Sequence, residues 1–336
     1  MLGFGRERPT WEGPGMIPEQ WYAVLDSREL PRRRPVGVRR LGRELVFWRR
    51  ADGVSCAADR CAHRGAALSA GELTDDRLRC PFHGFEYDAR GRCRLIPANG
   101  RAAEVPERFQ LRTLPARERE GLVFVWLGGG APDPPEPPFF DELCGRRWGG
   151  FQESWPVHYS RAIENQLDLA HLPFVHRTTI GRAGRTLVEG PRCRIEADRL
   201  LVWFDNARDR GVPPRDAAEL GPPTGPPLLS FRFPNLWWNR IGDRFGVFAA
   251  FAPVDDENTM IYLRFYQSIV RLPPFRRLFN FFANLYNRRI LRQDRRVVVT
   301  QRPRRSSLAS DEMLIAADKP IVLYRRRRAE LQRQQP

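Results

Sequence analysis

Four cysteine and histidine residues in the first third of the chain have the spacing of metal ligands. Cys61 and His63 form one pair, and after sixteen residues Cys80 and His83 form a second. Zinc fingers pair Cys with Cys and His with His, whereas a [2Fe–2S] cluster can take two thiolates on one iron and two imidazoles on the other. The pattern therefore favours such a cluster over zinc or over ordinary core residues. Its neutral histidines would raise the reduction potential.

A second possible metal site contains two more of the five histidines. The segment 160–172 is predicted to be helical, and Pro173 should break that helix. His171 would then leave the last turn and His176 the loop beyond, so that the two imidazoles can converge. Two histidines and one carboxylate with open positions are typical of non-haem Fe(II) oxygenases. Two buried histidines without metal are the alternative, less favoured beside a one-electron donor that needs an acceptor.

Asp294 is the carboxylate expected to complete this second site. Apolar residues stand three and four positions before and after it, within a long helix predicted over 274–301. A carboxylate in an apolar stripe is costly unless it is paired or metal-bound. An ion pair with an arginine is the alternative role, and Glu164 is an alternative carboxylate. Gln301 is expected to return to the same helix face.

With these residues in view, the chain resembles the Rieske non-haem iron oxygenases. The segments CAHRG, from Cys61, and CPFHGF, from Cys80, look like the two cluster loops of that family. Ala62 and Phe85 depart from its usual pattern, but neither position is a ligand. The resemblance extends over roughly residues 20–325 and implies the cofactors and the roles of individual residues.

The resemblance implies a [2Fe–2S] cluster and a mononuclear Fe(II), with O2 as co-substrate. The implied ligands are Cys61, His63, Cys80 and His83 for the cluster and His171, His176 and Asp294 for the mononuclear iron. Asp168, three residues before His171, would be the catalytic bridging aspartate between this iron site and a cluster-ligand histidine of a neighbouring subunit. A solvated helix charge is the alternative. Such a bridge needs a closed ring of subunits, and the family implies a homotrimer.

Composition sets limits on partners and location. The net charge of +16 comes from 56 basic and 40 acidic residues, with Lys319 the single lysine. No nucleic-acid-binding module is recognisable, although the positive surface could steer an acidic redox partner, with Arg64 nearest to a ligand. Cysteines without a disulfide pattern, and no secretory signal, favour the cytoplasm. The longest apolar run, 245–254, is too short to span a bilayer.

The length and the turn signals predict two domains of an α+β protein. The expected segments are a flexible tail (1–18), an all-β Rieske domain (19–130), a Pro-rich linker (131–140) and a catalytic domain with mononuclear iron (141–336). Strands followed by one long helix indicate an antiparallel sheet with a helix across it. The resemblance identifies this arrangement as the helix-grip fold.

The expected function is that of a terminal oxygenase acting on a small apolar or aromatic substrate. The sequence has no dinucleotide-binding motif and no second iron–sulfur cysteine set, so a separate reductase, a ferredoxin or both must deliver electrons from NAD(P)H. Hydroxylation or O-demethylation is favoured, because the length resembles the vanillate and dicamba demethylase types. Ring cis-dihydroxylation and a plain Rieske electron carrier are the alternatives. The pocket candidates are Phe231, Phe233, Trp237, Trp238, Phe248 and Phe251.

Overall fold

The computed structural model describes residues 15–129, 133–181 and 183–333. The described residues fall into two compact units. One is drawn from Met1–Tyr22, Asp26–Pro137 and Leu331–Pro336, and the other from Ala23–Leu25 and Pro138–Glu330. The predicted tail lies outside the described residues up to position 14, as do positions 131 and 132 of the predicted linker.

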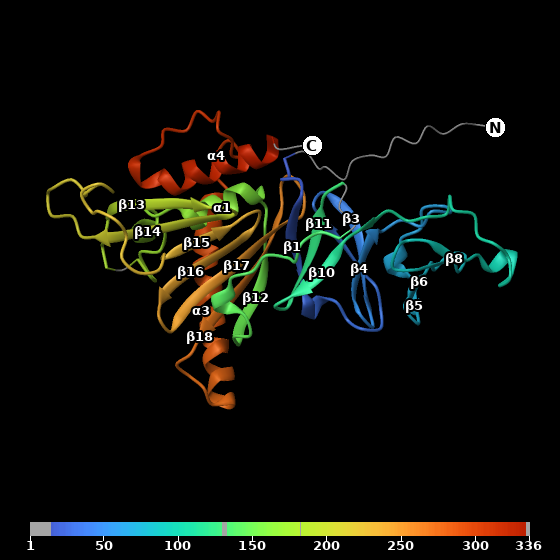
Figure 1. The fold of residues 1–336 in the computed structure, drawn as a ribbon. Coiled ribbons are helices and arrows are strands. Elements are labelled where there is room, and N and C mark those ends of the chain that lie inside the picture. Colours follow the sequence, from blue (N-terminus) through green and yellow to red (C-terminus); the bar gives the residue numbers. More distant parts are fainter. Residues whose placement is uncertain (1–14, 130–132, 182, 334–336) are drawn as a thin grey trace. The chain divides into compact units, whose positions relative to one another are not determined.

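The first unit is built on three small β-sheets (Figure 1), with strand orders β1-β11-β10, β2-β3-β4-β9 and β5-β6-β7-β8. The strands are β1 (Gln20–Asp26), β2 (Val36–Arg40), β3 (Arg43–Arg50), β4 (Gly53–Ala58), β5 (Glu72–Thr74), β6 (Arg77–Arg79), β7 (Glu86–Tyr87), β8 (Cys93–Leu95), β9 (Thr113–Leu114), β10 (Ala116–Arg119) and β11 (Leu122–Leu127). Short 3-10 helices are η1 (Ser27–Glu29), η2 (Leu68–Ala70) and η3 (Pro97–Asn99). Cys61 and Cys80 belong to a buried apolar cluster with Trp48, Leu78 and Tyr87.

The second unit contains a seven-stranded antiparallel sheet with the order β12-β18-β17-β16-β15-β14-β13. The strands are β12 (Trp148–Trp155), β13 (Leu187–Glu196), β14 (Arg199–Ala207), β15 (Leu229–Arg232), β16 (Leu236–Gly242), β17 (Phe245–Pro253) and β18 (Thr259–Gln267). The helices are α1 (Tyr159–Leu167), α2 (Leu172–Val175), α3 (Pro273–Val298) and α4 (Lys319–Arg333), with the 3-10 helices η4 (Asp141–Leu143) and η5 (Ala316–Asp318).

The long helix α3 lies against one face of this sheet. Two prolines at its first positions suit a helix start, because the N–H groups there have no intrahelical acceptor. Asn284 donates from its side chain to the Gly150 carbonyl of β12 (3.5 Å), and the Arg288 guanidinium stands 4.2 Å from the centre of the Phe151 ring. Helix α1 contacts both β17 and α3. This arrangement confirms the predicted α+β fold, with an antiparallel sheet and a long helix across it.

The six aromatic pocket candidates are all buried, but they divide between the two faces of the sheet. Trp237 pairs with Phe231, whereas Trp238 pairs with Phe248. Because successive residues of a strand point to opposite faces, Trp237 and Trp238 cannot line one pocket. The six candidates therefore cannot all line one pocket. Phe231 also contacts Tyr324 of α4, with ring centroids 5.3 Å apart, as expected for a core residue.

Several boundaries differ from the sequence prediction. The helix predicted over 160–172 ends at Leu167, because Asp168 adopts an extended conformation there and the break precedes Pro173. The α3 helix ends at Val298, so Gln301 lies beyond it and is exposed. Neither β16 nor α4 was predicted. Among the described residues, no helix is long and apolar enough to cross a membrane.

Candidate metal centres

The two predicted cluster loops have the same backbone turn. In each loop the cysteine N–H donates to the carbonyl five residues later, at 2.8 Å from both Cys61 and Cys80. The N–H of the glycine four residues after each cysteine donates back to the cysteine carbonyl, at 3.0 and 3.1 Å. These glycines, Gly65 and Gly84, have φ values of 75° and 70°, a region that residues with a Cβ enter only with strain. The loops thus form a matched pair of turns that carry the predicted cluster ligands.

The loops bury the two cysteines of the predicted ligand set and expose its two histidines. Cys61 and Cys80 are only 3% and 2% exposed, whereas His63 and His83 lie at the surface with ring centroids 4.7 Å apart. Phe85 stacks on the His63 ring at 4.8 Å. Two buried thiols facing two accessible imidazoles fit a [2Fe–2S] cluster whose histidine side is reachable from solvent.

Hydrogen-bond donors surround the two sulfur atoms. The hydroxyl of the fully buried Tyr87 lies 3.1 Å from the Cys61 sulfur. Burial and the contact with Cys61 raise the pKa of Tyr87, which keeps its proton available for donation. Burial also raises the pKa of Cys80, while the backbone N–H groups of Phe82 and His83 act in the opposite direction. Such donors stabilise a thiolate in a low-dielectric site. Sequence reasoning missed Tyr87, because no motif position marks it.

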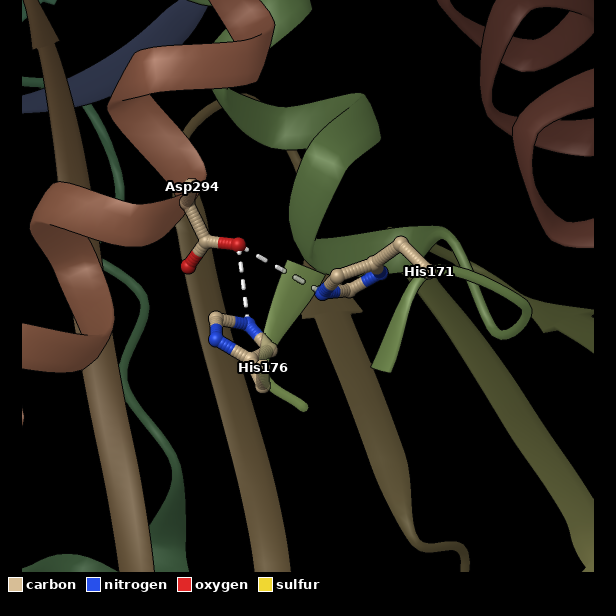
Figure 2. A group of neighbouring side chains, drawn as sticks. All are labelled: His171, His176 and Asp294. Atoms are coloured by element: carbon tan, nitrogen blue, oxygen red, sulfur yellow. Dashed lines mark ion pairs between the residues drawn. The ribbon is translucent and has the colours of Figure 1, made fainter. Parts of the chain in front are cut away.

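The structure brings His171, His176 and Asp294 together (Figure 2). Asp294 Oδ1 lies 3.0 Å from His176 Nε2 and 3.5 Å from His171 Nε2. One ligand atom from each residue lies within 4.8 Å of those of the other two. Asp294 is 3% exposed and His176 1%. A buried group of two imidazoles and one carboxylate fits a mononuclear iron of the facial-triad type.

The two histidines converge because α2 is a single short helical stretch. His171 is its N-cap and His176 its C-cap, and Pro173 occupies one of its first positions. Residues at the two ends of so short a helix can direct their side chains to the same point. The third residue, Asp294, comes from α3, which contacts α2.

Among the described residues, Asp294 has no ion pair with an arginine, and Glu164 does not take its place beside the two histidines. Asp294 forms its ion pairs with the two histidines and none with an arginine there, and the Asn165 amide donates to its Oδ1 at 3.4 Å. Glu164 instead pairs with Arg161 (2.9 Å) and Arg325 (2.6 Å) in a buried network. That network ties α1 to α4 and stands apart from the histidine pair.

Asp168 caps the end of α1 rather than sharing a helix face with His171, which corrects the predicted geometry. Its Oδ1 accepts the backbone N–H groups of Ala170 (2.8 Å) and His171 (3.2 Å) and lies 3.7 Å from His171 Nδ1. Burial raises the pKa of Asp168, but the hydrogen bond and charge of His171 outweigh it and lower the pKa overall. Burial lowers the pKa of His171, yet Asp168 and Asp294 raise it overall. The same two carboxylates would favour a bound cation.

Gln293 orients the second histidine. Its Oε1 lies 2.9 Å from His176 Nδ1 and also accepts the Thr179 hydroxyl at 2.7 Å, while its amide nitrogen donates to the Thr178 hydroxyl at 3.0 Å. With the amide in this orientation, Gln293 Oε1 accepts a hydrogen bond from Nδ1 of His176, which leaves the lone pair of Nε2 for a metal. Sequence reasoning missed Gln293. The only available signal was that a ligand histidine needs a partner for its other nitrogen.

His158, the remaining histidine, has a structural role. It is the N-cap of α1, and its Nδ1 lies 2.7 Å from the Ser160 hydroxyl and accepts the Ser160 N–H at 3.2 Å. Burial, followed by the charges of Arg328, Arg305 and Arg161, lowers the pKa of His158 to about 3. It therefore stays neutral at physiological pH.

Two known family models match separate parts of the chain, and each part contains one of the two candidate metal centres. Residues 20–115 match the family model described as the Rieske [2Fe-2S] domain. Residues 155–334 match the model described as the vanillate O-demethylase oxygenase C-terminal domain. The cluster loops fall in the first match and the histidine–carboxylate group in the second.

Similar proteins include oxygenases and chloroplast proteins. The chain is 28% identical over 324 residues to methylxanthine N1-demethylase NdmA of Pseudomonas putida, covering 93% of this chain and 88% of that protein. The solved structure of dicamba monooxygenase bound to dicamba shares the fold, with a TM-score of 0.74, 20% identity and coverage of 95% and 98%. Protein TIC 55 of Arabidopsis thaliana is 34% identical over 167 residues, 48% of this chain and 31% of that protein. The chain spans about a third of the length of the first curated relatives it matches.

Proposed function

Because the chain belongs to the oxygenases that join a Rieske [2Fe–2S] domain to a vanillate O-demethylase C-terminal domain, we propose that it is the terminal oxygenase of a Rieske-type system. It uses O2 and electrons from a separate NAD(P)H reductase to hydroxylate or demethylate a small apolar or aromatic substrate. The observation that carries this proposal is the buried group of His171, His176 and Asp294 in one chain with the cluster loops.

The proposed division of labour follows the two family matches. The proposed Rieske domain (19–130) holds the cluster, and the proposed catalytic domain (141–336) holds the mononuclear iron. The segment 131–140 is proposed to connect the two domains. The proposed cluster ligands are Cys61, His63, Cys80 and His83. When bound, the cluster supplies electrons one at a time and the mononuclear iron supplies the O2 chemistry.

Within the second site, the protein's own groups hold and orient the ligands. Gln293 accepts the Nδ1 proton of His176, and Asn165 donates to the carboxylate of Asp294, so each presents a defined atom to the metal. Asp168 keeps a negative charge beside His171. The burial of these groups excludes water from the ligand atoms and strengthens their attraction for a cation.

We further propose that Asp168 connects two subunits of a homotrimer. Its side chain is 32% exposed, and the backbone N–H groups of Ala170 and His171 both bind Oδ1. This arrangement supports a role for Oδ2 in accepting a proton from a histidine of another subunit. The carboxylate would then link the cluster of one chain to the iron site of the next.

The electron donor is proposed to dock at the exposed histidine side of the cluster loops. Arg64 is exposed there, and its guanidinium stands 5.6 Å from the centre of the Phe82 ring. An acidic ferredoxin or reductase would suit this charge. A cytoplasmic location is the matching proposal, because none of the six cysteines forms a disulfide and four of them have no proposed metal role.

A metal inventory combined with product analysis tests the function. Anaerobically purified protein should hold about three irons and two acid-labile sulfides per chain, as one [2Fe–2S] cluster plus one iron requires. With a reductase, NAD(P)H and O2, a panel of aryl methyl ethers, N-methyl heterocycles and aromatic acids should release formaldehyde or hydroxylated product from at least one member. His171→Ala should lose only the mononuclear iron and all turnover. An iron-to-sulfide ratio of one in the wild type would make the chain an electron carrier instead.

A further inference from the structure

The N-terminal half of α3 has its polar and apolar faces in the reverse of the usual arrangement. Asparagines face the sheet: Asn284 bonds to Gly150, and Asn280 packs so closely on Gly149 that a Cβ there would lie 2.9 Å from the Asn280 Cβ. The large apolar side chains point to solvent instead. These residues, the apolar stripe, are Phe275 (62% exposed), Leu278 (57%), Phe281 (58%), Phe282 (60%) and Leu285 (51%).

The apolar stripe forms a continuous row on one helix surface. Its members are spaced three, four and seven residues apart, which places them on one side of an α-helix. This end of α3 extends past the sheet in Figure 1. A surface helix normally buries such a row, and a contiguous exposed patch of this kind marks a contact with another apolar phase or molecule.

The charges that α3 itself carries beside the stripe are all positive. Residues 258–293 contain no aspartate or glutamate, whereas Arg271, Arg276, Arg277, Arg288, Arg289 and Arg292 accompany the helix. A twofold contact between two copies of this face would oppose arginines to arginines without an acidic partner. An anionic lipid bilayer has an apolar interior and negatively charged headgroups at its boundary. The apolar stripe is complementary to the interior, and the flanking arginines are complementary to the headgroups.

We propose that the N-terminal half of α3 lies on an anionic membrane surface, with the apolar stripe inserted at the headgroup boundary and the exposed Arg271, Arg277, Arg289 and Arg292 among the lipid phosphates. The helix lies on the bilayer and does not cross it. This proposal does not rest on the oxygenase reaction. It would, however, place an enzyme for apolar substrates beside the phase in which such substrates dissolve.

Vesicle co-sedimentation of the full chain tests this proposal. Vesicles of phosphatidylcholine mixed with phosphatidylglycerol should bind the protein, more strongly than vesicles of phosphatidylcholine alone, and added salt should weaken the binding. Phe281→Gln combined with Leu285→Gln should lower binding at least about tenfold. Arg277→Gln combined with Arg289→Gln should lower binding to the mixed vesicles by roughly tenfold and leave the weak phosphatidylcholine binding unchanged.

Matched controls use exposed residues away from α3. Met313→Gln with Ile315→Gln, and Arg210→Gln with Arg326→Gln, should bind the mixed vesicles as the wild type does. The cluster's visible spectrum and the iron content of each variant should equal those of the wild type, which shows that each variant folds. A chain that lacked mononuclear iron would refute the proposed function without affecting the vesicle result.

Two outcomes would overturn the membrane proposal. One is an absence of vesicle binding together with a lower solution mass for the stripe variant, which would make the stripe an interface between copies of the chain. The other is a loss of vesicle binding in the control variants equal to that in the α3 variants. The binding would then depend on the total charge and hydrophobicity of the protein and not on α3.

Discussion

Tyr87 is the residue through which the protein can adjust the proposed cluster's potential. Its buried hydroxyl lies 3.1 Å from the Cys61 sulfur and would donate to it once a cluster holds that sulfur as a thiolate, and the bond would strengthen when the cluster gains an electron and becomes more negative. Tyr87→Phe should therefore lower the reduction potential by about 20–60 mV, which corresponds to roughly 0.5–1.5 kcal/mol of hydrogen-bond strength.

Protein-film voltammetry of the oxygenase would measure this shift, and Tyr22→Phe is the matched control. Tyr22 is equally buried, but its hydroxyl contacts Ile17 rather than sulfur. If the reduction potential shifted equally in both variants, the cause would be a general loss of packing in the first unit and not the lost contact between Tyr87 and Cys61.

Gln293 is expected to control the affinity of the second site for iron. Gln293→Leu removes the acceptor that fixes His176, so His176 can rotate or change tautomer, and iron affinity should fall about 10–100-fold. Gln293→Glu keeps an acceptor at the same place and should retain the metal. Retained iron after dialysis against chelators of increasing strength measures the affinity, with the cluster's visible spectrum as an internal standard. Unchanged iron retention in Gln293→Leu would limit Gln293 to packing.

At the scale of single elements, α1 depends on a neutral histidine at its N-cap. An unfolded His158 takes up a proton near its ordinary pKa of 6.5, whereas the folded protein does so only near about 3. The folded-state pKa is the lower one, so this contribution to stability is fully present above about pH 6.5 and is lost as the pH falls towards 3. Between pH 7 and pH 5 the loss is about 2 kcal/mol.

His158→Asn tests this pH dependence, because asparagine is also a good N-cap and does not titrate. The unfolding free energy of the variant, measured in urea at several pH values, should fall less steeply between pH 7 and pH 5 than that of the wild type. Parallel curves for the two proteins would mean that His158 is not the titrating group.

The elements also show what the sequence could and could not predict. Several strands and α3 were recognisable because apolar periodicity and Pro/Gly turns are local signals, although β16 was not predicted. The end of α1 was misplaced, because the capping preference of Asp168 competes with Pro173 and both lie within a few residues. The arginine-rich α4 was missed, because its helix is stabilised by buried ion pairs such as Arg325 with Glu164, partners far apart in sequence.

The site itself was largely predictable, because metal ligands must be particular residue types. Residue chemistry selected His171 and Asp294, which the structure brings together, and it selected Cys61 and His63, whose role as ligands stays a prediction. Gln293 and Tyr87 could not, because an amide or a phenol has many uses and only folding shows which atom it meets. The same reason accounts for the aromatic candidates, which composition grouped together and strand register separates.

For the whole molecule, Asp168 provides the test of communication between subunits. Asp168→Asn removes the negative charge and keeps the side-chain shape, so both metal sites should remain filled. The cluster should be reduced by a chemical donor at the normal rate, but its reoxidation with substrate and O2 should slow at least about a hundredfold. Stopped-flow absorbance of the cluster measures this step.

The alternatives to this role give different results. Turnover within a few-fold of the wild type would make Asp168 a helix cap and nothing more. Loss of the mononuclear iron would make it a support for His171. A trimer of unchanged mass in the variant would locate the defect in electron transfer rather than in assembly.

The unbroken length of α3 has a consequence for substrate traffic. Phe281 in the stripe and Asp294 in the metal site lie thirteen residues apart on one helix, about 20 Å along its axis. In the proposed arrangement the helix lies along the bilayer, so this distance runs beside the surface and separates the reacting centre from the inserted side chains. A molecule dissolved in that surface would therefore have to leave the lipid and move along the helix before it could reach the buried metal site.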